Sequence, residues 1–190
     1  MRWRKLAEWI VTLAATAIVV LAFEAEIAQP FRVPTSSMEP TLDCAKPGLG
    51  CTASFNDRVI VAKIVYRFRN PDRGEIAVFH APAAAKRLCG EGGVFLKRVI
   101  GLPGDTVHQD AGGFIWVDGR KLDEPYIHPA QRAGDDNDNR TWHVPKGDYF
   151  MMGDNRADSC DSRTWGSVKR SAFIGPVVAT YWPLTRLTIR

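Results

Sequence analysis

The chain has 190 residues, with 25 Lys and Arg against 21 Asp and Glu, so its formal net charge is +4. Hydrophobic residues make up 45% and charged residues 24%, the proportions of an ordinary globular protein. This composition excludes a disordered chain, a collagen-like chain and a membrane protein with many spans. A net charge of +4 over this length is weak evidence for nucleic-acid binding.

The N-terminal segment differs from the rest of the chain. Residues 1–5 hold three basic residues, and residues 6–23 are almost wholly apolar, with Glu8 as their one charge. At 1.5 Å per residue this run forms about 27 Å of helix, close to the thickness of a bilayer's hydrocarbon core. Basic residues before a span favour a cytoplasmic N-terminus. We therefore predict a cytoplasmic tip at 1–5, a transmembrane anchor at 6–23 and an extracytoplasmic domain at 24–190.

A cleavable secretory signal is the alternative interpretation of this segment, because it also has a basic tip and an apolar run. The run is long for such a signal, and residues 22–28 offer no clean small-x-small cleavage site. An uncleaved anchor is therefore favoured, and both interpretations export the rest of the chain.

Export places the cysteines Cys44, Cys51, Cys89 and Cys160 in an oxidising compartment. Four cysteines allow three pairings. Cys44 and Cys51 flank a loop rich in Pro and Gly, so a local bridge there is the simplest expectation and leaves Cys89 with Cys160. Buried free thiols are the alternative. The chain has no Cys-x-x-Cys pair, which argues against structural zinc.

The exported part is expected to be mainly β. Short apolar, β-branched runs separated by turn residues predict strands at 59–62, 76–79, 95–100, 114–117 and 177–181. No long helical periodicity occurs outside the anchor.

Two connecting segments carry further signals. Asp118-Gly119 predicts a tight hairpin after the strand at 114–117. Residues 130–140 are polar and are expected to form a loop, because their Asp and Asn pattern lacks the Gly placement and closing Glu of a calcium loop.

Three segments place unusual polar residues beside strands, at 33–41, 94–105 and 152–166. In the second, strand alternation puts Phe95, Lys97 and Val99 on one face. Burial of a lysine on an apolar face lowers its pKa and provides a neutral amine that can accept a serine proton. A lysine that reaches water from an edge strand is the alternative.

The other two segments supply hydroxyls and charges. Thr35, Ser36 and Ser37 are equally eligible nucleophiles by residue type, so the residues alone do not select one. The third segment combines charges and hydroxyls with Trp165 and Gly166, which indicates a partly buried polar network. The four histidines suggest neither a catalytic triad nor a metal site.

Together these segments resemble the type I signal peptidases (leader peptidases), membrane-anchored serine proteases with a Ser-Lys dyad. The resemblance extends from the anchor to the C-terminus. Its main boxes, in family order, are 37–41, 97–105 and 153–166, with shorter matches at 57–61, 73–76 and 126–127.

The resemblance implies a role for each matching residue. Ser37 matches the nucleophile, because the family nucleophile immediately precedes the methionine at Met38, and Lys97 matches the general base. Ser159 matches the serine that orients the lysine.

The remaining positions match supporting and substrate-binding residues. Asp161 and Arg163 match a charged pair that supports the site, and the oxyanion hole would use the Ser37 backbone N–H and the Thr35 hydroxyl. Shallow pockets for small P1 and P3 side chains are expected to be lined by Phe31, Val33, Met38, Leu42 and Leu96.

The chain departs from the family pattern in the third box. Ala157-Asp158 replaces the more usual Asp-Asn before Ser159, which puts the local hydrogen bonds in doubt. Cys160 lies inside the box, so a bridge to Cys89 would tie the box to the strand that leads into Lys97. The segment at about 106–150 matches the position of the family's cap insertion, although it is short for one.

The resemblance implies a single-span plasma-membrane serine endopeptidase that removes signal peptides from exported preproteins through an acyl-enzyme. Its partners would be extended signal peptides and the lipid bilayer, and no cofactor, metal or nucleic acid is expected. One alternative is a specialised processing peptidase of one secretion or conjugation system. Another is a non-catalytic, membrane-tethered β-domain that binds extended peptides by strand addition.

Overall fold

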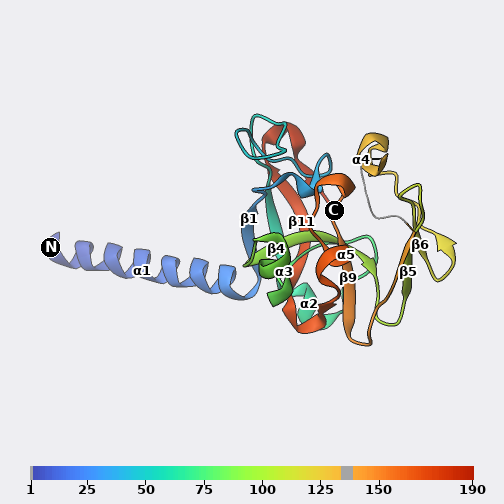
Figure 1. The fold of residues 1–190 in the computed structure, drawn as a ribbon. Helices are drawn as coiled ribbons and strands as arrows, with labels where there is room; N and C mark the ends of the chain where they lie inside the picture. Colours follow the sequence, from blue (N-terminus) through green and yellow to red (C-terminus); the bar gives the residue numbers. More distant parts are fainter. Residues whose placement is uncertain (1, 134–138) are drawn as a thin grey trace.

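A computed structural model describes residues 2–133 and 139–190. Helix α1 (Arg2–Glu26) projects away from a folded, mainly β domain (Figure 1). Within the described residues, one helical stretch, Trp3–Ala22, is long and apolar enough to cross a membrane. The mainly β domain behind an apolar N-terminal helix confirms the predicted fold class.

The main sheet has eight strands in the order β1-β2-β11-β3-β4-β9-β10, and β12 pairs with β11. All of its pairs are antiparallel, and the sheet curls into a half-barrel. The strands are β1 (Ala28–Arg32), β2 (Arg58–Ala62), β3 (Ile76–His80), β4 (Val94–Gly101), β9 (Asp148–Met152), β10 (Val168–Lys169), β11 (Phe173–Trp182) and β12 (Thr188–Ile189).

A second sheet has four strands in the order β7-β6-β5-β8 and lies at one side of the domain (Figure 1). Its hairpin confirms the predicted tight turn, because Asp118 and Gly119 both have positive φ, +49° and +75°, as a two-residue turn requires. The strands are β5 (Thr106–Gln109), β6 (Ile115–Val117), β7 (Arg120–Lys121) and β8 (Arg140–His143).

The helices after α1 are all short within the described residues. The loop expected at 130–140 is partly wrong, because Pro129–Ala133 forms a helix and Arg140 begins a strand, while residues 134–138 lie outside the described residues. Proline at the first helical position and the helix-forming residues after it explain this turn of helix. The elements are α2 (Val65–Phe68), α3 (Ala83–Cys89), α4 (Pro129–Ala133), α5 (Ser162–Trp165), η1 (Ser36–Met38), η2 (Arg156–Asp158), η3 (Arg170–Ala172) and η4 (Leu184–Arg186).

The five predicted strands are all present, in β2, β3, β4, β6 and β11, although Phe114 of the predicted 114–117 lies just before β6. Strand β1 was not predicted from its sequence, Ala-Gln-Pro-Phe-Arg, which lacks an apolar alternating pattern. It occupies one edge of the sheet, where Pro30 is tolerated because its missing N–H removes no bond from the interior.

The core consists of three apolar clusters, and β4 contributes to each of them. Phe95 and Val99 pack in the first cluster, Leu96 in the second and Ile100 in the third, which lies between the two sheets. This separation confirms that Phe95 and Val99 share one face of the strand and that Leu96 and Ile100 share the other. The Lys97 amine lies 6.0 Å from the centre of the Phe95 ring, so Lys97 is on the face of Phe95 and Val99.

A buried ion pair connects the segment after β7 to η2. The Arg156 guanidinium pairs with the Glu124 carboxylate, and both side chains are essentially inaccessible to solvent. Arg132 of α4 also donates to Glu124, at 3.1 Å. Glu124 thus links two parts of the chain that are distant in sequence.

We predict that Glu124→Ala lowers the free energy of unfolding by about 3–5 kcal/mol, because it leaves the buried Arg156 charge unpaired. The matched control is Asp72→Ala, since Asp72 pairs with Arg69 at the surface and its loss should cost less than about 1 kcal/mol. Chemical denaturation of the two variants measures the difference, and equal destabilisation would contradict a structural role for the buried pair.

Candidate active site

A cleft of about 510 Å³ brings together residues from the three segments that the sequence analysis singled out. One wall comes from β1 and the residues up to η1, and the other from the first half of β4. Its lining includes Phe31, Val33, Thr35, Ser36, Ser37, Met38, Val94, Phe95, Leu96, Lys97, Asp158 and Cys160.

Ser37 lies in η1 and is 8% exposed. Its carbonyl oxygen accepts the Asn155 N–H at 3.1 Å, and the Asn155 side-chain amide donates to the Ser36 carbonyl at 3.2 Å. The Thr35 hydroxyl lies 3.3 Å from the Ser37 hydroxyl. The backbone of η1 is therefore held by the third box, while the Ser37 hydroxyl faces Thr35.

Ser36 differs from Ser37 in its hydrogen bonding. The Ser36 hydroxyl donates to the carboxylate of Asp158, one of the two residues that depart from the family pattern. A side chain at Gly50, which has φ +73°, would overlap both of these groups. Asp158 therefore supplies a contact between the third box and η1 that the sequence analysis did not identify.

Lys97 lies on β4, opposite Ala77 of β3, and is 5% exposed. Burial disfavours its ammonium form and lowers the pKa of Lys97 to about 8, although the Asp161 carboxylate acts in the opposite direction. The side chain is thus buried in the cleft, and the alternative of a lysine that reaches water from an edge strand is wrong. A neutral amine is accessible near physiological pH.

Asp161 and Arg163 form a buried ion pair at the start of α5. The Asp161 carboxylate accepts two hydrogen bonds from the Arg163 guanidinium, each 2.8 Å long, and one from the Gly153 N–H at 3.0 Å. Burial is the largest single influence and would raise the pKa of Asp161, but the charge and hydrogen bonds of Arg163, the Lys97 charge and the Gly153 N–H together lower it. Arg163 also donates to the carbonyls of Arg156 and Ser159.

Ser159 lies beside the backbone of Ser37. A Cβ at Gly153 would overlap both the Ser159 hydroxyl and the Ser37 carbonyl oxygen, so glycine is required where these residues meet. The Ser159 hydroxyl is buried and has no hydrogen-bond partner within the part of the chain that the structure describes.

A second buried pair connects the second and third boxes. Arg98 donates to the two carboxylate oxygens of Asp154, at 2.8 and 2.5 Å, and its guanidinium stacks 3.8 Å from the centre of the Tyr126 ring. The sequence analysis included all three residues in its motifs but assigned them no role. Opposite charges in two separate boxes were the signal that could have suggested this pair.

The apolar residues predicted to contact the substrate do not all lie in the cleft. Phe31, Val33, Met38 and Leu96 line it. Leu42 is instead fully buried in the cluster that contains Val33 and Met38, so it packs behind the wall. Its side chain follows η1 into the core, which the sequence motif did not reveal.

The cysteines pair as expected, Cys44 with Cys51 and Cys89 with Cys160. Cys44 and Cys51 lie close enough to Glu39 to suggest a metal-binding cluster. A disulfide has no thiolate to offer a metal. Glu39 accepts hydrogen bonds from Thr52, so this cluster is explained by its own contacts.

Residues 6–182 match the protein family described as signal peptidase, peptidase S26, so the chain belongs to this family. A probable signal peptidase I-2 from Synechocystis sp. is 40% identical over 187 residues, which cover 97% of this chain and 76% of that protein. Signal peptidase I from Leptolyngbya laminosa is 38% identical over 185 residues, with 96% and 82% covered. Signal peptidase IB from Staphylococcus aureus is 32% identical over 196 residues, with 96% and 92% covered.

Among solved structures, a signal peptidase I from Enterococcus faecalis V583 is similar to this chain, with 33% identity and a TM-score of 0.46. The similarity covers 57% of this chain and 97% of the other. Family membership confirms the resemblance on which the sequence analysis relied, and it makes this chain a peptidase.

We predict that breaking the Cys89–Cys160 bridge lowers catalytic activity, because the bridge joins the end of α3, just before β4, to the third box across 71 residues of sequence. The measurement is kcat before and after reduction with dithiothreitol, and for the double variant Cys89→Ser, Cys160→Ser. Cys44→Ser with Cys51→Ser is the control, since that bridge does not line the cleft. Unchanged activity with all thiols shown to be free would contradict the prediction.

Proposed function

We propose that this chain is a membrane-bound serine endopeptidase that removes signal peptides from exported preproteins with a dyad of Ser37 and Lys97. The observation that carries the proposal is that Ser37 and a buried Lys97, with a pKa of about 8, line one cleft. The names of the family and of its relatives support the choice of substrate.

The proposed reaction begins when the neutral Lys97 amine accepts the proton of the Ser37 hydroxyl. The Ser37 oxygen attacks the scissile carbonyl, and the tetrahedral intermediate collapses to an acyl-enzyme as the leaving amine takes a proton from the Lys97 ammonium. Lys97 then accepts a proton from water, whose oxygen attacks the ester. Hydrolysis releases the signal peptide and returns the proton to Ser37.

The residues around the dyad support two further assignments. The Thr35 hydroxyl and the Ser37 backbone N–H are proposed to donate hydrogen bonds to the oxyanion. The Thr35 hydroxyl lies 3.3 Å from the Ser37 hydroxyl, which favours this role. Ser159 is proposed to orient the Lys97 amine, because its buried hydroxyl finds no other partner in the described part of the chain.

Asp161 and Arg163 are proposed to position these groups without entering the reaction. Their ion pair is buried, and Asp161 holds the Gly153 N–H beside the Ser159 hydroxyl.

The strand pairing supports an extended substrate. Among the described strands, β1 pairs with β2 alone. Strand β9, which also pairs with β10, covers β4 only from Arg98 onwards. Two strand edges, 28–32 and 94–97, therefore border the cleft, where an extended peptide can form main-chain hydrogen bonds. Phe31, Val33 and Leu96 supply apolar walls that suit small side chains.

The proposed cellular location of the protein is based on helix α1 and on the two disulfides. Helix α1 is proposed to anchor the chain in the plasma membrane with its basic N-terminus in the cytoplasm. The two disulfides favour an oxidising, extracytoplasmic location for the domain. The second sheet, formed by residues 106–109, 115–117, 120–121 and 140–143, is proposed to be the cap-like insertion.

We predict that Ser37→Ala and Lys97→Ala each reduce cleavage of a reporter preprotein by at least about 10³-fold, because each removes a group that acts as part of one unit. Ser36→Ala is the matched control and should retain most activity, since the Ser36 hydroxyl is bound to Asp158 rather than to Thr35. The assay uses purified full-length protein in detergent with alanine before the scissile bond. Full activity in either dyad variant, or equal cleavage with phenylalanine at that position, would contradict the proposal.

We also predict that kcat/KM rises as the pH increases through about 8, because below the pKa of Lys97 the amine is protonated and cannot accept the serine proton. The rate should fall about tenfold per pH unit well below the pKa. Glu91 provides a check, since its carboxylate raises the pKa of Lys97 and Glu91→Gln should shift the profile to lower pH. A profile that is flat between pH 6 and 9 would show that Lys97 is not the base.

A further inference from the structure

The segment that carries Ser37 is closed at its two ends by hydrogen bonds to one residue, Asp57, which precedes β2. The Val33 N–H donates to the Asp57 carbonyl at 2.9 Å, and the Asp57 N–H donates to the Asp43 carbonyl at 2.9 Å. The Asp43 N–H also donates to the Asp57 carboxylate at 3.0 Å. Residues 33–43 therefore form a closed loop around η1, which we call the nucleophile loop.

Arg186 of η4 binds the second half of the nucleophile loop. Its Nε donates to the Asp57 carboxylate at 3.1 Å, across 129 positions of sequence. Its Nη2 donates to the carbonyls of Pro40 and Thr41, at 3.1 and 3.2 Å. Its Nη1 lies 3.0 Å from the Asp43 carboxylate. One guanidinium therefore contacts two carboxylates and two backbone carbonyls.

The Asp57 carboxylate requires a cation, because its side chain is only 1% exposed. Within the part of the chain that the structure describes, Arg186 is the cationic residue that contacts it. A guanidinium suits this position because its N–H groups are fixed in a planar fork, whereas an ammonium group is a compact charge on a flexible stem. Arg186 thus offsets a buried charge and fixes the path of the backbone at the same time.

The backbone that Arg186 holds is continuous with η1. Pro40, whose carbonyl it binds, is three residues after Ser37, and the Leu42 N–H donates to the Met38 carbonyl at 3.0 Å. A displacement of residues 40–43 would therefore move η1 and the Ser37 hydroxyl with it. A displacement of about 1 Å in a reacting group can slow catalysis by about 10²-fold.

We propose that Arg186 is a positioning residue, which holds the nucleophile loop in the conformation that presents the Ser37 hydroxyl to the cleft. The inference rests on the proposed function, since it takes Ser37 as the nucleophile. The described lining of the cleft does not include Arg186, so it acts through the loop and does not touch the substrate. It also lies outside residues 6–182, which match the family.

The test measures kcat and KM of purified, full-length Arg186→Ala and Arg186→Lys with the reporter preprotein in detergent. Arg186→Ala should lower kcat about 10- to 100-fold and leave KM within about twofold, because the nucleophile moves and the substrate contacts do not. Arg186→Lys keeps a cation beside Asp57 but not the fork, so its kcat should lie between those of Arg186→Ala and the wild type.

A kcat within about twofold of wild type in both variants would overturn the proposal. Should Arg186→Ala not fold, Arg186→Lys decides alone, through a lowered or an unchanged kcat.

Two further measurements separate positioning from a general loss of structure. A peptide that spans the reporter's cleavage site should bind with equal Kd to Ser37→Ala and to the double variant Ser37→Ala, Arg186→Ala. The pH profile of Arg186→Ala should keep the wild-type midpoint, because Arg186 is not among the charged groups that act on Lys97. A Kd that weakens as much as kcat/KM falls, or a shifted midpoint, would contradict the positioning role.

Arg69→Ala is the matched control. The Arg69 side chain is 41% exposed, against 36% for Arg186, and it also pairs with two carboxylates, those of Asp72 and Glu75. Its contacts lie outside the nucleophile loop, so this variant should keep kcat within about twofold of wild type. An equal loss of kcat in Arg69→Ala and Arg186→Ala would show that the effect is not specific to the loop, and the proposal would fail.

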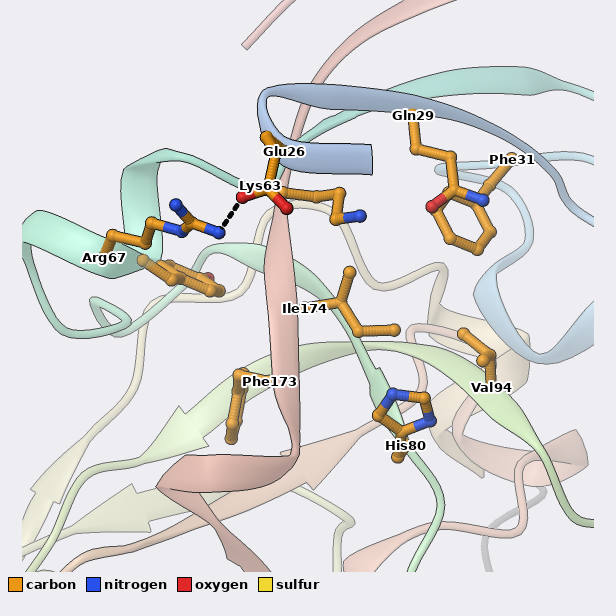
Figure 2. Close-up of a pocket in the computed structure, with 10 residues that line it drawn as sticks. Glu26, Gln29, Phe31, Lys63, Arg67, His80, Val94, Phe173 and Ile174 are labelled. Atoms are coloured by element: carbon orange, nitrogen blue, oxygen red, sulfur yellow. Dashed lines mark hydrogen bonds and ion pairs between the residues drawn. The ribbon is translucent and has the colours of Figure 1, made fainter. Parts of the chain in front are cut away.

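A second control lies at a cavity of about 530 Å³ near the end of α1, where Arg67 pairs with Glu26 (Figure 2). The described lining of this cavity includes no residue of the nucleophile loop, so Arg67→Ala should also retain its kcat.

Ser37→Ala distinguishes a failure of this inference from a failure of the proposed function. If Ser37→Ala remains active, the proposed function is wrong and the inference with it. If Ser37→Ala is inactive and both Arg186 variants are fully active, only the inference is wrong.

Discussion

The burial of Lys97 is the constraint on which the rest of the site depends. A lysine amine is a useful base near neutral pH only when water does not stabilise its ammonium form, so the side chain must lie inside the domain. Strand β4 achieves this by placing Lys97 between Phe95 and Val99, which pack in the core on the same face. The apolar core thus sets the protonation state of the group proposed to act as base.

A buried amine also requires that nearby carboxylates do not restore its charge. Asp161 and Asp154 both raise the pKa of Lys97, and each is bound through both of its oxygens by an arginine, Arg163 and Arg98. These arginines neutralise the carboxylates, which limits their attraction for the ammonium group. Buried pairs of this kind contribute little net stability. We interpret the Asp161–Arg163 and Asp154–Arg98 pairs as holding the third box against β4, while the Lys97 amine can still lose its proton.

The sequence predicted the parts of this arrangement that depend on local pattern. Alternation along 95–99 was sufficient to place Lys97 on an apolar face. The choice of Ser37 came instead from the resemblance to the family, whose nucleophile immediately precedes the methionine that matches Met38. It did not predict β1, whose residues form a strand because they pair with β2 and not through their own propensity. Nor did it predict the bond from Ser36 to Asp158, because those residues are 122 positions apart and meet only in the folded chain.

Strand β1 connects helix α1 to the proposed active site. Strand β1 begins two residues after α1 ends, so the helix that is proposed to span the membrane leads directly into one wall of the cleft. Under the proposed function, a substrate whose apolar segment lies in the same bilayer would be delivered alongside β1, with its cleavage site near the membrane surface. Because the free edge of β1 and the first half of β4 border the same path, main-chain pairing can align the peptide before any side chain is recognised. In the proposed function, selection by side chains is then left to the cleft near Ser37.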